Sequence, residues 1–162
     1  MPKSRKVFAM ATKQDIKQYW EDKQPSQWYS KKDSGSKEYY DDVERKRYNY
    51  FCPYIPKVAE FDKHKGEKVL EIGVGMGLDL KQYAQNGSIC YGIDLTEGSI
   101  KKARELLDAY GLKADLQVMD AENLKFEDNT FNLVYSFGVL HHTPDTQKSI
   151  DEIYRVLTPG GK

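Results

Sequence analysis

Three acidic residues lie at sequence positions from which the folded chain could bring them to one ligand. Glu71 precedes a glycine-rich segment, Asp94 ends one apolar run, and Asp120 follows another. Carboxylates attract cations and accept hydrogen bonds from hydroxyl and amine groups. We therefore expect a ligand that carries positive charge together with hydroxyl and amine donors.

The glycine-rich segment separates this ligand from the common nucleotides. Gly73, Gly75 and Gly77 permit a tight turn and a close approach to the backbone. A dinucleotide fingerprint would need a glycine at position 78, where the sequence has Leu78, and the G-K-[ST] signature of a triphosphate site is absent. Glu71 would repel a pyrophosphate and attract an ammonium or sulfonium group. The segment favours a cationic ligand.

Asp94 and Asp120 each have two interpretations. Asp94 can accept both hydroxyls of a ribose, or it can begin a turn and cap the following helix. Asp120 can accept from the exocyclic amine of adenine while the Ala121 amide meets a ring nitrogen, or it can be an ordinary loop acid. The residues alone leave these alternatives open.

The candidate residues are placed by an alternation of predicted strands and helices. Four apolar segments are predicted strands: 69–72, 89–93, 116–119 and 131–137. Three segments with helical periodicity lie between or after them: 78–85, 96–110 and 143–157. This order predicts an open α/β sheet of parallel strands, which binds ligands at the carboxyl ends of its strands.

The last predicted helix has the first-turn signature Thr143-Pro144. Its apolar residues Ile150, Ile153 and Leu157 predict the buried stripe.

The part before the sheet has a different composition. We predict a disordered tail over 1–11, a helical cover over 12–65 and a ligand-binding domain over 66–162. Four aromatic residues of the cover either stack on a ligand cation or pack ordinarily against the core: Tyr19, Trp20, Trp28 and Tyr29.

Composition excludes several classes. The net charge of +0 argues against a general nucleic-acid binder. No apolar run approaches the roughly 20 residues of a membrane span, so we expect a cytoplasmic protein. Cys52 and Cys90 lack the spacing of a disulfide framework or a zinc site.

Four motifs occur in order and resemble one family. They are Val69–Gly77, Gly92-Ile-Asp94, Asp120-Ala-Glu122 and Phe131–His142. The chain resembles the class I S-adenosylmethionine-dependent methyltransferases, specifically the small-molecule group that includes quinone-biosynthesis enzymes. The resemblance implies S-adenosylmethionine as cofactor, S-adenosylhomocysteine as product, and a small-molecule acceptor. Two alternatives are an NAD-type oxidoreductase and a non-catalytic module that keeps the cofactor fold.

The resemblance also implies a role for each motif residue. Glu71 would lie near the methionine amino group, and Gly73 and Gly75 would let that portion approach. The other expected cofactor contacts are Asp94 at the ribose, Leu95 on the adenine face, Asp120 and Ala121 at the adenine edge, and Ser136 and Phe137 facing the amino acid.

Methyl transfer from a sulfonium needs alignment and desolvation more than acid–base groups, and it needs no metal. A base is required only when the acceptor must lose a proton. His141 and His142 follow the fourth predicted strand, and we rank His141 first as the residue that meets the acceptor. A histidine bonded to loop backbone is the alternative.

The family sheet has seven strands, and this chain supplies the first four. The fold is thus expected to be Rossmann-like and to stop after the fourth strand. That strand, 131–137, would then lie at the sheet edge, and we expect either that it pairs with a second copy or that the chain is part of a longer protein.

Overall fold

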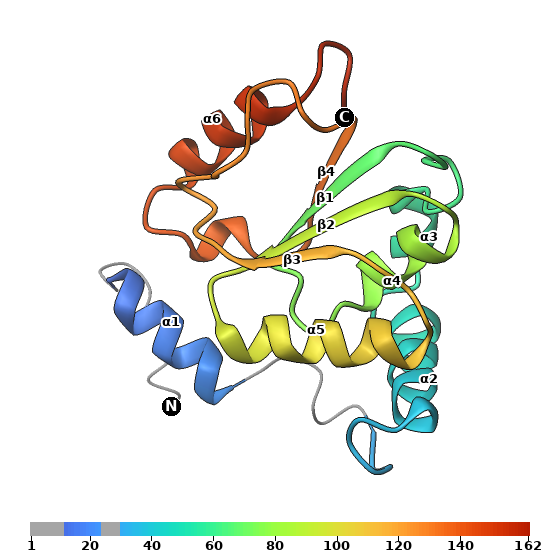
Figure 1. The fold of residues 1–162 in the computed structure, drawn as a ribbon. Helices are drawn as coiled ribbons and strands as arrows, with labels where there is room; N and C mark the ends of the chain where they lie inside the picture. The colour runs from blue at the N-terminus through green and yellow to red at the C-terminus, as the bar shows by residue number, and fades with distance from the viewer. Residues whose placement is uncertain (1–11, 24–29) are drawn as a thin grey trace.

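A computed structural model describes residues 12–23 and 30–162 (Figure 1). The predicted tail 1–11 and two of the predicted cover aromatics, Trp28 and Tyr29, lie outside the described residues.

The centre of the fold is a parallel sheet in the order β3-β2-β1-β4. Its strands are β1 (Lys68–Ile72), β2 (Ile89–Asp94), β3 (Asp115–Val118) and β4 (Leu133–Ser136). The predicted α/β fold with parallel strands is confirmed. Ile72 is in register with Ile93 and with Ser136, so the glycine segment and the residues after β2 and β4 emerge at the same edge.

Helices cover both faces of the sheet (Figure 1). On one face, α4 (Leu78–Gln85) and α5 (Glu97–Ala109) pack in a core cluster that includes Val69 of β1. On the other face, α6 (Thr146–Val156) contributes Val156 to a second cluster with Leu70 and Ile72. Alternate residues of β1 therefore point to opposite faces, and Glu71 shares the α4 side with Val69.

The described N-terminal residues 12–23 and 30–65 are largely helical. It contains α1 (Lys13–Asp22), α2 (Lys37–Lys46), the π-helical turn η2 (Arg47–Phe51) and α3 (Ile55–Ala59). Tyr39, Tyr40 and Val43 of α2 join the same core cluster as α4 and α5. Two polar pairs add to this packing, Lys81 with Glu44 and Tyr110 with Asp41. The region from α2 onward is thus packed directly against the α4 and α5 face.

The prediction for the last helix was partly wrong. Asp145, not Thr143, caps α6 by accepting from the Lys148 amide at 3.0 Å. The buried residues are Ser149 and Val156, and Ile150 is 45% exposed. Polar residues on α6 fix its rotation, and an apolar stripe alone does not reveal them.

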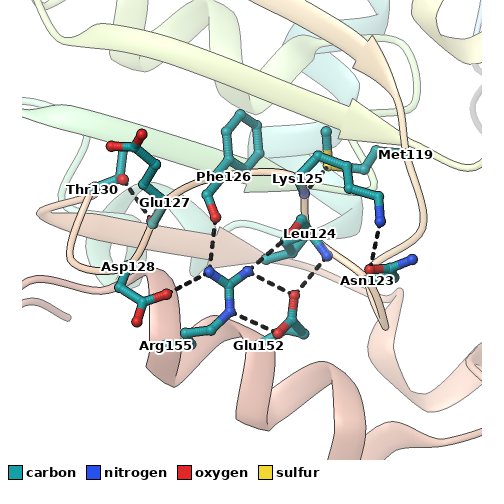
Figure 2. A network of polar contacts seen from close by, with 10 residues as sticks. All are labelled: Met119, Asn123, Leu124, Lys125, Phe126, Glu127, Asp128, Thr130, Glu152 and Arg155. Atoms are coloured by element: carbon teal, nitrogen blue, oxygen red, sulfur yellow. Dashed lines mark hydrogen bonds and ion pairs between the residues drawn. The ribbon is translucent and has the colours of Figure 1, made fainter.

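Figure 2 shows these polar residues. Arg155 donates to the backbone oxygens of Phe126 at 2.8 Å and Leu124 at 3.0 Å, and to the Asp128 carboxylate at 2.8 Å. The Glu152 carboxylate accepts hydrogen bonds from the Arg155 guanidinium and from the Leu124 amide, the latter at 2.7 Å. This network ties α6 to the loop between β3 and β4, and so supports the segment that carries Asp120.

β4 lies at the edge of the sheet, as predicted. Its outer side already pairs at one end, because Lys162 accepts from the Val134 amide at 2.9 Å and donates to the Asn132 oxygen at 3.0 Å. Association of two copies through this edge stays a prediction. None of the helices in the described ranges is long and apolar enough to cross a membrane.

Candidate functional site

A cavity of about 320 Å³ lies at the carboxyl ends of the strands. Its walls come from the glycine segment, the residues after β2, β3 and β4, and the helix α1. Among the predicted contacts, eight line this cavity: Glu71, Gly73, Gly75, Asp94, Leu95, Asp120, Ala121 and Phe137. Gly77, Ser136 and His141 do not belong to its lining.

Glu71 is the most unusual residue of the cavity. It is only 4% exposed, and its Oε2 finds no hydrogen-bond partner within residues 12–23 and 30–162. Burial, with Asp79 nearby, raises the pKa of the Glu71 carboxyl well above its ordinary value, and Arg47 opposes this rise. A buried oxygen without a partner is costly unless a ligand satisfies it.

Beside Glu71, Asp79 at the start of α4 gathers a cluster of donors. Arg47 reaches Asp79 through Nε at 3.0 Å and Nη2 at 2.5 Å. The hydroxyls of Tyr48 and Tyr135 donate to the same carboxylate at 2.6 and 3.1 Å. Arg47 also lies over the Phe137 ring, 5.1 Å from its centroid. Since Asp79 uses Nε and Nη2, Nη1 of the guanidinium stays outside this pair.

Two glycines of the segment are required by the backbone conformation and by packing within the protein. Gly73 has φ of +78°, and a Cβ there would lie 2.2 Å from Val139 Cγ2. Gly77 has φ of +86°, and its Cβ would lie 3.1 Å from the Ala103 backbone on α5. Both positions therefore exclude side chains before any ligand is considered. The predicted approach of a ligand to Gly73 stays a prediction.

Asp94 has the turn role that the sequence left open, whereas its contact with a ribose stays a prediction. Its Oδ1 accepts from the Thr96 amide at 3.0 Å and the Thr96 hydroxyl at 2.8 Å. Its Oδ2 accepts from the Gly75 amide at 3.0 Å, which fixes the glycine segment against β2. Asp94 thus orders the loop start and also lines the cavity, together with Leu95.

Asp120 is also already engaged. Its Oδ1 accepts from the Glu122 amide at 2.9 Å, and its Oδ2 receives Lys13 Nζ at 2.6 Å. Lys13 comes from α1, and it also meets Glu122 Oε2 at 2.6 Å. Ala121 is buried between these acids and faces the cavity.

The region after β4 differs from the prediction at two residues. Ser136 donates its hydroxyl to the Ile72 oxygen at 3.1 Å, so its side chain fastens β4 to β1. The turn η3 (Leu140–His142) places His142 on the cavity wall and leaves His141 exposed. The histidine on the cavity wall is thus His142 rather than His141, and the His141 ring lies on its outer side with the two ring centroids 3.9 Å apart.

His142 lies against α1. Its ring centroid is 5.2 Å from that of Trp20, which also lines the cavity. Burial and the neighbouring His141 lower the pKa of His142 below its ordinary value. The imidazole is therefore held mainly neutral near pH 7 and can accept a proton.

Sequence reasoning missed three charged residues of the cavity: Lys13, Arg47 and Asp79. Arg47 did leave a signal, since it continues the apolar stripe of Tyr40 and Val43, where a charge is unexpected. Lys13 left none. No cluster of three or more His, Cys, Asp or Glu suited to a metal ion occurs in the part of the chain that the structure describes.

The fold and the cavity define the class of protein. It is an open α/β protein with a ligand cavity at the switch between β1 and its two neighbours, lined by carboxylates. The chain belongs to the methyltransferase domain family, whose model matches residues 70–162.

Individual relatives agree with this assignment. The chain is 39% identical over 106 residues to tocopherol O-methyltransferase, chloroplastic, of Arabidopsis thaliana, covering 64% of this chain and 30% of that protein. It is 33% identical over 98 residues to ubiquinone biosynthesis O-methyltransferase of Coxiella burnetii, covering 60% and 42%. The crystal structure of the PH0226 protein of Pyrococcus horikoshii shares the fold with a TM-score of 0.64 and 28% identity, covering 90% of this chain and 63% of that one.

The chain thus spans less than half the length of these two curated relatives. The family and the fold are established by the matches, and the resemblance seen in the four sequence motifs is confirmed.

Proposed function

We propose that this chain binds S-adenosylmethionine and forms the cofactor-binding part of a small-molecule methyltransferase. The observation that carries the proposal is the unpartnered Oε2 of Glu71, which is buried within the cavity of a methyltransferase domain. An ammonium group is the natural partner for such an oxygen.

The residues fit the methionine end of this cofactor, which carries both an ammonium and a carboxylate. Glu71 would accept from the ammonium. Arg47 would donate to the carboxylate through Nη1, the nitrogen outside its pair with Asp79. Asp79 would hold Arg47 in place, since the two-point ion pair fixes the plane of the guanidinium.

The residues also fit the adenosyl end. Asp94 would accept from the ribose hydroxyls with lone pairs that remain after its bonds to Gly75 and Thr96. Asp120 would accept from the adenine amine, with the Ala121 amide at the ring edge and Leu95 on its face.

When bound, the cofactor supplies a methyl group on a sulfonium, which is a good leaving group. The protein's part is to align the reactants and exclude water. Trp20 and Phe137 line the cavity and would exclude water from it. His142, on the cavity wall, would take a proton from an acceptor whose reactive group is protonated.

The proposed acceptor is a small molecule. Two relatives carry names that refer to tocopherol and to ubiquinone biosynthesis, which are both small molecules. O-methylation of a hydroxyl would require His142 as the base, whereas methylation of a neutral amine would not require it.

Isothermal titration calorimetry tests the binding step directly. Wild-type protein should bind S-adenosylmethionine and S-adenosylhomocysteine but not NAD, and Asp94→Ala should weaken both interactions at least tenfold, about 1.4 kcal/mol. Asp62→Ala is the control, since this aspartate is 67% exposed and lies outside the cavity. Binding of NAD alone would revive the oxidoreductase, and no heat with any of the three ligands would favour the non-catalytic module.

A further inference from the structure

Lys13 joins α1 to the rest of the cavity through two short ion pairs. Its Nζ lies 2.6 Å from Asp120 Oδ2 and 2.6 Å from Glu122 Oε2. The Lys13 side chain is 42% exposed, whereas the Glu122 side chain is only 5% exposed. A buried carboxylate needs partners, and Lys13 is the cation that supplies one here.

Glu122 has a second partner at the start of α6. Its Oε1 accepts from the Asp145 amide at 2.9 Å, at the cap of α6. The Asp120–Glu122 segment is therefore held between α1 and α6. Lys13 provides the contact from α1, and it lies 107 residues from Asp120 in the sequence.

Helix α1 rests on the cavity at two further points. Ile16 is 7% exposed and lines the cavity, and Trp20 meets the His142 ring. In Figure 1 the helix lies beside the end of the sheet where β3 and α5 come together with the loop before α6. Helix α1 therefore forms the part of the cavity wall that lies beside Asp120.

We propose that Lys13 is a positioning residue that controls access of the adenosyl group to Asp120. This rests on the proposed function, because it takes Asp120 as the carboxylate that receives the adenine amine. Without cofactor, Lys13 bridges Asp120 and Glu122 and holds α1 over the cavity. The arriving amine shares or replaces Lys13 at Oδ2, and Lys13 stays on Glu122, so α1 remains attached.

This arrangement predicts an effect on rates that a purely structural ion pair would not give. Removing the Lys13 charge should let α1 open more readily, so association and dissociation of the ligand should both become faster. An ion pair of this exposure opposes opening only modestly, so we expect association to be about fivefold faster in Lys13→Met. Lys13→Arg should restore the wild-type rates, because it keeps the charge.

Stopped-flow fluorescence of the whole chain with S-adenosylhomocysteine measures these rates. The sequence contains two tryptophans, so the Trp28→Phe background leaves Trp20 on α1 as the reporter. Lys17→Met is the matched control, one helical turn along α1 and outside the cavity lining. Glu122→Gln is a second test, because it removes the charge that retains Lys13 and can keep the bond from the Asp145 amide.

The outcomes are distinct. Faster association in Lys13→Met and Glu122→Gln, with wild-type rates in Lys17→Met and Lys13→Arg, supports the proposal. Ligand binding with unchanged association in Lys13→Met overturns it and leaves the proposed function standing, as does an equal effect of Lys17→Met. Absence of binding in the wild type overturns the proposed function, and the role of Lys13 falls with it.

Discussion

The two ends of the cavity hold their carboxylates in opposite states. At the end beside α4, Glu71 is buried and has an oxygen without a partner among the residues described. At the end beside α1, both oxygens of Asp94 and both of Asp120 already accept hydrogen bonds. At the first end a carboxyl oxygen is left for a ligand, whereas at the second end groups of the protein already bond to the carboxylates.

This difference assigns different tasks to the two ends. A charge withdrawn from water interacts strongly with an opposite charge, whereas a solvated and partnered carboxylate gains little from one more donor. Most of the binding free energy should therefore come from the Glu71 end. The Asp120 end should control orientation and access, because its contacts can be exchanged at small cost.

The largest effect should follow from breaking the charge balance of the buried end. Arg47→Met leaves the Asp79 carboxylate, which is 3% exposed, without its cation. We expect the free energy of unfolding to fall by about 3 kcal/mol in urea denaturation. Arg45→Met is the control, because Arg45 is 58% exposed in its pair with Asp42, and it should cost less than about 1 kcal/mol. Equal losses in the two variants would contradict a charge-coupled buried end.

The second effect has opposite signs for binding and stability. Glu71→Gln removes the proposed partner of the ammonium, so affinity for S-adenosylhomocysteine should fall about 30-fold, or roughly 2 kcal/mol. The free energy of unfolding should stay the same or rise, since a neutral amide replaces a buried carboxyl whose ionised form is disfavoured by burial. Calorimetry and urea denaturation measure the two quantities. Glu105→Gln, at a residue whose side chain is 49% exposed and whose partner Lys101 is 79% exposed, should alter neither.

The pH dependence of stability provides a third test of the same carboxyl. The pKa of Glu71 is raised in the folded protein by burial and by Asp79. Above the ordinary value of 4.5, the unfolded chain loses this proton while the folded chain keeps it, so stability falls as the pH rises toward the raised pKa. Glu71→Gln should lack this fall. Parallel stability curves for the two proteins between pH 4.5 and neutrality would show that Glu71 is not responsible.

Much of the fold and part of the site were predictable because they depend on local patterns. The predicted helix 78–85 matches α4, and the four predicted strands differ from the observed ones by a few residues at most. Glu71, Asp94 and Asp120 were found because residues at the ends of parallel strands meet at one edge. The rotation of α6 was not predicted, since Arg155 and Glu152 fix it through bonds to a distant loop.

The missed site residues are those that act across the chain. Arg47 meets Asp79 from 32 residues away, and Lys13 meets Asp120 from 107 residues away. No periodicity within a helix or strand encodes such pairs, and a lysine on a polar helix has the appearance of a solvated charge. The order of His141 and His142 likewise depended on the direction of a single turn, which their adjacency in the sequence leaves open.

The smallest effect should come from the partnered end, and its size tests the comparison directly. Asp120→Asn removes a carboxylate whose charge Lys13 already balances and whose side chain is 29% exposed. The adenine amine is a neutral donor, so affinity for S-adenosylhomocysteine should fall by about 1 kcal/mol, or about fivefold. Asp115→Asn, an exposed aspartate at the start of β3, is the control in the same titration and should bind as the wild type does. If Asp120→Asn weakened binding more than Glu71→Gln, recognition would be concentrated at the adenosyl end, because a partnered carboxylate would then contribute more than a buried one that lacks a partner.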